Sequence, residues 1–199
     1  MSPASSTPDH RHLRPSPTLG LVSPFKVTPE PFPTATFTDV LAANERFAAD
    51  YHAPETLTGR AAKGLAVVTC MDSRVDPLEI LGMGRGDVKI LRNAGARVTE
   101  DVLRTLALAA YLLDVDRVLV MPHTDCRMAK GEEADVHAAI YENYGVDTRS
   151  MEFAVSSDQV TTLRRDVIRV RAFPLLPTYV VVGGAIYDVT TGELRPQDI

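Results

Sequence analysis

The sequence predicts an α/β fold in which an open, mostly parallel β-sheet is flanked by helices and preceded by an N-terminal helical arm. Apolar, strand-like runs alternate with helix-like segments along the chain, and right-handed crossovers between parallel strands produce this order. The strand-like runs are apolar at nearly every position, which is typical of strands that helices cover on both faces. The chain has 199 residues, 45% of them hydrophobic and 24% charged, so it is long enough for one buried core.

The N-terminal region divides into a tail and a helix. Residues 1–33 contain eight of the fourteen prolines, interleaved with Ser and Thr, and show no periodic apolar pattern. We therefore expect a disordered, proline-rich tail over residues 1–34 and a single α/β domain over residues 35–199. A helical arm is expected to begin near Thr38, with Thr38 or Asp39 as its cap. Its apolar stripe comprises Val40, Leu41, Phe47 and Ala48.

The remaining elements follow from hydrophobic patterning. In chain order they are a buried strand at 64–70, a short helix at 76–82, a strand at 87–93, a helix at 102–114, a strand at 116–122, a partly helical region at 128–144, a helix at 159–171 and a strand at 178–189. Helix 102–114, capped by Thr99 or Asp101, has apolar residues around most of its circumference, so we expect burial on more than one side. The pairing of the final strand is left open.

Charge and hydropathy restrict the class of partner. The net charge is −5, from 21 basic and 26 acidic residues, without a long run of either sign. This argues against nucleic acid or an anionic membrane as the main partner and favours a small-molecule substrate. No stretch approaches the ~18 apolar residues of a membrane-spanning helix, and the start of the chain lacks the apolar segment of a secretory signal. We therefore expect a cytoplasmic protein.

Potential metal ligands follow two of the predicted strands. Cys70 and Asp72 come at the end of the first strand, and His123 and Cys126 follow the third. The carboxyl ends of parallel strands lie at one edge of a sheet, so these side chains are expected to converge. Two thiolates and an imidazole favour zinc, and three protein ligands with one exchangeable position are typical of a catalytic zinc site. Asp72 could complete the tetrahedron or leave it open.

Two other readings of these residues exist. The first is that these residues have no common role, because polar residues at a strand end are common by chance. Against it, the only two cysteines of the chain occupy equivalent topological places. A thiol enzyme would use Cys70 as its nucleophile and Arg74 to bind an oxyanion. Such loops usually carry glycines whose amides cradle the anion, whereas Met71, Asp72 and Ser73 supply no glycine and add a repelling carboxylate.

Three segments of the sequence resemble the signature segments of the β-class carbonic anhydrases, in the same order. They are Cys70-Met71-Asp72-Ser73-Arg74, Arg92-Asn93-Ala94-Gly95 and His123-Thr124-Asp125-Cys126. The resemblance runs from about Thr38 to the end of the chain and is closest to the shorter bacterial branch. One departure is Arg127, because a glycine commonly follows the second cysteine in that family.

The resemblance implies a carbonate dehydratase, a lyase that hydrates carbon dioxide reversibly to bicarbonate and a proton through a zinc-bound hydroxide. Its zinc ligands would be Cys70, His123 and Cys126. Asp72 would orient the hydroxide, and Arg74 would pair with Asp72 and keep it off the metal. Asp72 would be a fourth ligand only in a closed, inactive state. The family also implies a homodimer or higher homo-oligomer, with the N-terminal helix reaching across a neighbour.

Two alternatives share this metal site. Relatives of the family hydrolyse carbon disulfide or carbonyl sulfide, and the three segments do not separate these substrates from carbon dioxide. A non-catalytic zinc-binding protein would keep Asp72 permanently on the metal, because structural zinc sites are closed.

Overall fold

The computed structural model describes residues 30–54 and 56–199. Contacts group the chain into one unit that ends at His52 and another that spans Ala53–Ile199. Most of the predicted tail over residues 1–34 lies outside the described residues, and the predicted boundary at residues 34 and 35 stays a prediction.

The first unit contains helix α1, Thr38–Ala49, as the apolar stripe predicts. The expected cap is wrong: Phe37 precedes the helix and no side chain caps it. The Thr38 hydroxyl instead donates a hydrogen bond back to the Thr34 carbonyl, at 3.0 Å. None of the residues of α1 is buried, and Val40 and Phe47 are more than half exposed.

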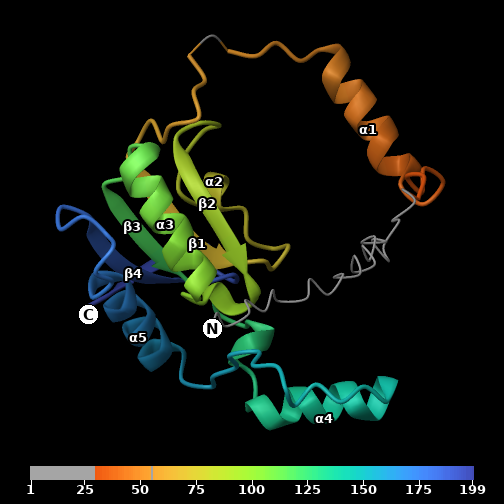
Figure 1. Ribbon diagram of the computed structural model, residues 1–199, viewed down its shortest axis with the longest axis vertical. Helices are drawn as coiled ribbons and strands as arrows, with labels where there is room; N and C mark the ends of the chain where they lie inside the picture. Colours follow the sequence, from red (N-terminus) through yellow and green to blue (C-terminus); the bar gives the residue numbers. More distant parts are fainter. Residues whose placement is uncertain (1–29, 55) are drawn as a thin grey trace, which may run out of the picture. The chain divides into compact units, whose positions relative to one another are not determined.

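The second unit is built on a five-stranded sheet with the order β2-β1-β3-β4-β5 (Figure 1). The strands are β1 Leu65–Cys70, β2 Val88–Asn93, β3 Arg117–Met121, β4 Val181–Tyr187 and β5 Leu194–Gln197. The first four pair in parallel, so β4 continues the parallel sheet. Strand β5 pairs antiparallel to β4 and was not predicted, because its short sequence contains Arg195 and Pro196 and has no strand-like pattern.

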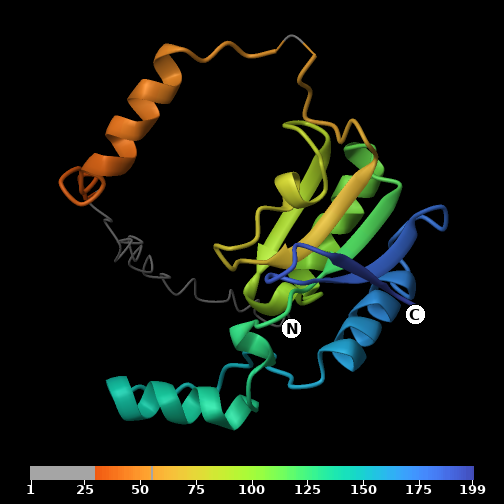
Figure 2. The ribbon, with the colours of Figure 1, turned by 180° about the vertical axis from the view of Figure 1, so that it is seen from behind.

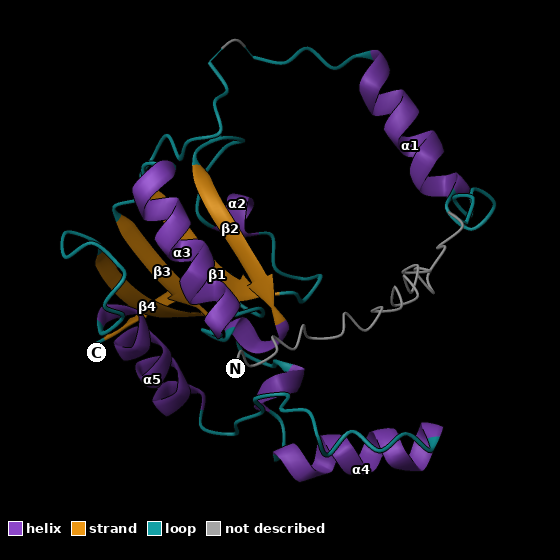
Figure 3. Ribbon diagram, in the orientation of Figure 1, coloured by secondary structure: helices purple, strands orange, loops and turns teal. Residues whose placement is uncertain are grey.

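The long helices α3, Glu100–Leu112, and α5, Gln159–Arg171, lie on one face of this sheet and, of the described helices, only the short helix α2, Pro77–Ile80, lies on the other, as Figures 1 and 2 show from opposite sides. Helices α3 and α5 contribute Leu106 and Val167 to the main core cluster. Helix α2 packs Ile80 on the opposite face. Helix α4, Glu133–Tyr144, and the 3-10 turns η1, Ala94–Ala96, and η2, Arg127–Ala129, complete the elements (Figure 3). Within the described residues, no helix has the length and apolar character needed to cross a bilayer.

The predicted N-terminal cap of helix α3 is confirmed, but its predicted burial is not. Thr99 caps it, since its hydroxyl accepts a hydrogen bond from the Val102 amide. Leu108, Tyr111 and Leu112 are exposed by 45%, 62% and 64%. The expected burial on more than one side is therefore wrong within the single chain, because only one face of α3 meets the sheet and α5.

Candidate metal centre

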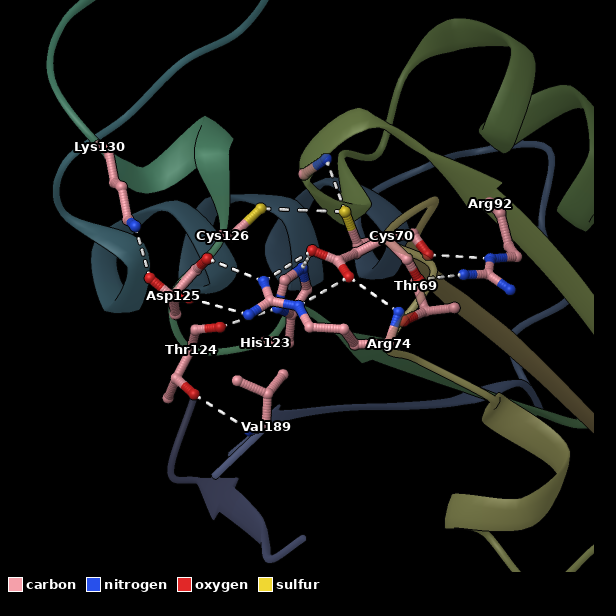
Figure 4. A network of polar contacts seen from close by, with 12 residues as sticks. Thr69, Cys70, Arg74, Arg92, His123, Thr124, Asp125, Cys126, Lys130 and Val189 are labelled. Carbon is pink, nitrogen blue, oxygen red and sulfur yellow. Dashed lines mark hydrogen bonds and ion pairs between the residues drawn. The ribbon is translucent and has the colours of Figure 1, made fainter. Parts of the chain in front are cut away.

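The centre lies at the carboxyl ends of two neighbouring interior strands, β1 and β3. Cys70 is the last residue of β1, and its neighbour Thr69 pairs with Met121 at the end of β3. The Thr69 hydroxyl donates a 2.8 Å hydrogen bond to the Met121 carbonyl, which fixes the two strand ends together. His123 lies two residues beyond the end of β3, after Pro122, and forms a bridge with Tyr187 of β4. The chain then turns back so that Cys126 faces Cys70 (Figure 4).

The predicted ligands Cys70, His123 and Cys126 converge. Their ligand atoms all lie within 4.8 Å of one another, and the two sulfur atoms are 3.8 Å apart. The three residues are buried, with exposures of 4%, 1% and 4%. This group is able to hold a metal ion.

The orientation of the imidazole tests whether a zinc ion fits. His123 Nδ1 lies 2.8 Å from the Thr124 carbonyl oxygen, so Nδ1 carries the proton and Nε2 presents its lone pair. Nε2 is the one fully buried side-chain nitrogen or oxygen in the described part of the chain that lacks a hydrogen-bond partner. A buried acceptor without a partner is costly unless something coordinates it. Two sulfurs and this nitrogen form a donor set that fits zinc.

The two thiols share a buried environment. Burial raises the pKa of Cys126 to about 11, against a smaller lowering by the backbone hydrogen bond from Met128, and the nearby Cys70 sulfur raises it further. The amide of Gly95 donates to Cys70 Sγ at 3.4 Å. Because a metal binds the thiolate, loading this site must displace the proton of Cys126.

Asp72 and Arg74 form the bidentate pair that the sequence predicts. Arg74 Nε donates to Asp72 Oδ1 at 3.0 Å, and Nη2 donates to Oδ2 at 2.8 Å. These bonds are the main reason that the pKa of Asp72 lies well below its usual range. Asp72 Oδ2 is 3.7 Å from His123 Nε2, so the carboxylate lies beside the three ligands while both of its oxygens bind the guanidinium.

Two further residues, Asp125 and Lys130, belong to this network and were not predicted. Arg74 Nη1 donates to Asp125 Oδ2 at 2.8 Å, and Nη2 donates to the Asp125 carbonyl at 3.1 Å. Lys130 pairs with the other Asp125 oxygen, and hydrogen bonds from Lys130 and then Arg74 lower the pKa of Asp125 to about 2. Arg74 thus joins the loop after β1 to the loop after β3 (Figure 4). The only indication in the sequence that Asp125 belongs to the site is its place inside the third signature segment.

Arg92 contacts the same loop from β2. Its Nε donates to the Cys70 carbonyl at 2.9 Å, and its Nη2 donates to the Asp72 carbonyl at 2.7 Å. The side chain therefore holds the backbone that carries both Cys70 and Asp72. The sequence placed Arg92 in a signature segment without assigning this contact.

Arg127 does not strain the loop that follows Cys126. It begins η2 and is exposed, and its Nη1 donates to the Lys130 carbonyl at 3.1 Å. The left-handed backbone of this loop belongs to Asp125, with a φ of 56°, and Arg127 is not among the described residues with positive φ. A glycine is therefore not required at position 127.

Comparison with known proteins agrees with this geometry. A family model described as carbonic anhydrase matches residues 65–146. The β-carbonic anhydrase 1 of Mycobacterium tuberculosis strain H37Rv is 34% identical over 158 residues, which cover 79% of this chain and 94% of that protein. The crystal structure of a carbonic anhydrase from Streptococcus mutans matches with a TM-score of 0.75 and 33% identity, over 81% of this chain and 98% of that one. A carbon disulfide hydrolase of Acidithiobacillus thiooxidans is 28% identical over 152 residues, covering 66% of this chain and 76% of that protein.

Proposed function

The chain belongs to the β-carbonic anhydrase family, and from this premise we propose that Cys70, His123 and Cys126 hold the zinc ion of its active site. As a member it is a carbonate dehydratase, a lyase that hydrates carbon dioxide reversibly to bicarbonate and a proton, with zinc as its cofactor. One observation supports the ligand assignment above all: the lone pair of the buried His123 Nε2 has no hydrogen-bond partner and lies with two sulfurs.

The chemistry divides between the metal and the chain. When bound, zinc supplies Lewis acidity, which lowers the pKa of water from about 15.7 to about 7 and so makes hydroxide available near neutral pH. Asp72 is ionised and positioned beside the ligands, where it can accept a hydrogen bond from the attacking hydroxyl and orient a lone pair toward carbon dioxide. Arg74 holds both Asp72 oxygens, and therefore keeps the carboxylate from becoming a fourth ligand.

The assignment is tested by metal content and turnover in the same preparations. Purified protein is expected to contain zinc and to hydrate carbon dioxide, and Cys126→Ser is expected to lose both. Arg60→Ala is a matched control, because it removes the exposed Arg60–Asp114 pair on another part of the unit. Full activity in zinc-free protein would refute the assignment.

The non-catalytic reading requires Asp72 to stay on the metal. Both Asp72 oxygens engage Arg74 instead, which supports a site with an exchangeable position. X-ray absorption of the zinc-loaded protein at two pH values is the direct test. A fourth ligand that remains a carboxylate at both values would support the non-catalytic reading.

Hydrolysis of carbon disulfide or carbonyl sulfide is the second candidate function. It is favoured by the similarity to the Acidithiobacillus enzyme, although the identity and the coverage are lower than for the carbonic anhydrase of M. tuberculosis. A hydrogen sulfide release assay beside a carbon dioxide hydration assay decides between them. We expect turnover with carbon dioxide and little release of hydrogen sulfide.

We further propose that the protein works in the cytoplasm as a homodimer or higher homo-oligomer. The apolar residues that α1 and α3 leave exposed support association with a second copy, since such surface is costly in water. Deleting residues 1–50 and measuring the mass in solution tests whether α1 contributes. An unchanged number of chains per particle, calculated from that mass, would remove α1 from the interface.

A further inference from the structure

The turn η1 brings a backbone donor to one of the proposed zinc ligands. The Gly95 amide donates to Cys70 Sγ, and the φ of Gly95 is 80°, in the region that favours glycine. A Cβ at this position would lie 3.0 Å from the Cβ of Met128, in the turn that follows Cys126. The turn is therefore packed closely between the two sulfur-bearing loops, and its position determines whether the N–H reaches the sulfur.

Side chains at each end of the turn hold it. The Asn93 side chain accepts a hydrogen bond from the Arg97 amide at 2.8 Å and donates one to the Arg97 carbonyl at 2.7 Å, so it closes the turn. The Arg97 guanidinium extends outward from it. Its Nε donates to Asp166 Oδ2 at 2.7 Å, and its Nη1 donates to the Ala154 carbonyl at 2.7 Å.

Asp166 is a buried charge that the proposed chemistry does not use. It belongs to α5, is 4% exposed and pairs with Arg97 across 69 positions of the sequence. A buried ion pair is weak evidence for stability, because the cost of desolvating both charges offsets their attraction. Its geometric effect is definite, however: it fixes the turn that carries Gly95 to a core helix of the sheet.

A hydrogen bond to a thiolate changes how that sulfur binds a metal. The N–H withdraws electron density from the sulfur, so the sulfur donates less charge to the ion. Loss of this bond makes the thiolate a stronger donor and leaves it less well oriented. The position of η1 is therefore a means of adjusting the electronic properties of the metal site from outside its ligands.

We propose that Arg97 and Asp166 are positioning residues for Cys70: by anchoring η1 to α5, they keep the Gly95 N–H on the Cys70 sulfur and so set its donor strength. The inference deepens the proposed function and rests on Cys70 being a ligand. It assigns a role to a buried pair that touches neither substrate nor metal.

The test uses the full chain loaded with Co²⁺, whose thiolate-to-metal charge-transfer absorption reports sulfur donor strength. The main variant is the double substitution Arg97→Met with Asp166→Leu, because replacing a buried pair by apolar residues usually preserves folding. Its charge-transfer band is expected to move to longer wavelength, with metal affinity weaker by about 10-fold or more. Asp101→Asn, which removes an exposed ion pair with Arg104 on α3, is the control and should leave the band unchanged.

Arg97→Lys keeps the charge beside Asp166 but cannot reproduce the fork to Asp166 and Ala154, so a smaller shift in the same direction is expected. This variant decides the matter if the double variant does not fold. An unmoved band in the folded variants would overturn the inference even if metal affinity fell, because affinity can fall for purely structural reasons. Absence of any thiolate charge-transfer band in the unmutated protein would instead refute the proposed ligand set.

Discussion

Replacing Arg74 by alanine separates the orientation of Asp72 from its charge. The substitution removes the hydrogen bonds from Nε and Nη2 to the two Asp72 oxygens, while the backbone amide of residue 74, 2.9 Å from Oδ1, is retained. The oxygen set free is Oδ2, which lies 3.7 Å from His123 Nε2 and is therefore the one nearest the proposed zinc ligands. Arg74→Ala should thus leave Asp72 in place but allow it to turn toward the metal.

The size and pH dependence of the effect follow from this geometry. Loss of a partner that orients a group beside a metal typically costs about 10- to 100-fold in activity, and we expect turnover to fall by this amount. Without Arg74 the pKa of Asp72 rises toward the ordinary value of about 3.9, which leaves the carboxylate ionised at neutral pH. Ionisation of Asp72 itself should therefore add no pH dependence to the loss between pH 6.5 and 8.

The assay is stopped-flow hydration of carbon dioxide, with zinc measured in the same samples. Zinc content should remain near one equivalent per chain, because Arg74 contacts none of the three ligand atoms. Arg60→Ala serves as the control for removal of an exposed ion pair. Turnover equal to that of the unmutated protein, or a loss that parallels a loss of zinc, would contradict the reasoning.

Three further outcomes are expected. Because burial raises the pKa of Cys126 to about 11, zinc binding at pH 8 should release the proton of this thiol. Calorimetry in buffers of different ionisation enthalpy should detect the released proton. A binding heat that does not depend on the buffer would contradict this expectation. The pKa of Asp125 is about 2 in the folded protein and about 3.9 in the unfolded chain. Its contribution to stability is therefore full above pH 4 and is lost as the pH falls toward 2. Asp125→Asn should remove this contribution from the acid unfolding transition followed by circular dichroism. Leu106→Ala, at a fully buried position of α3, should lower the free energy of unfolding by about 2–5 kcal/mol in urea titrations, whereas Leu175→Ala, at an exposed position outside α1 and α3, should change it little.

The sequence was sufficient to predict that the three proposed ligands converge, because their placement depends on simple rules. Cys70 ends an apolar strand and His123 follows another, and parallel strands bring such positions to one edge. The pairing of Asp72 with Arg74 needs only a two-residue separation. These features do not depend on how the rest of the chain packs.

Other parts of the site depended on tertiary structure that patterning does not encode. Asp125 bonds to Arg74 from a backbone with a positive φ, a conformation that hydrophobic patterning does not predict for an aspartate. The partner of Arg97 lies on α5, where Asp166 looks like an ordinary polar position of an amphipathic helix. Strand β5 forms because β4 presents a free edge, not because Leu194–Gln197 has a strand pattern of its own.

Three arginines act together around Cys70, each on a different segment. Arg74 joins the loops after β1 and β3, Arg92 holds the carbonyls of Cys70 and Asp72, and Arg97 anchors the turn that faces the Cys70 sulfur. A guanidinium is a rigid planar fork, so each contact restricts orientation as well as distance. The three arginines therefore restrict the position of Cys70, a proposed zinc ligand, through its own loop, through the loop after β3 and through the turn that faces its sulfur.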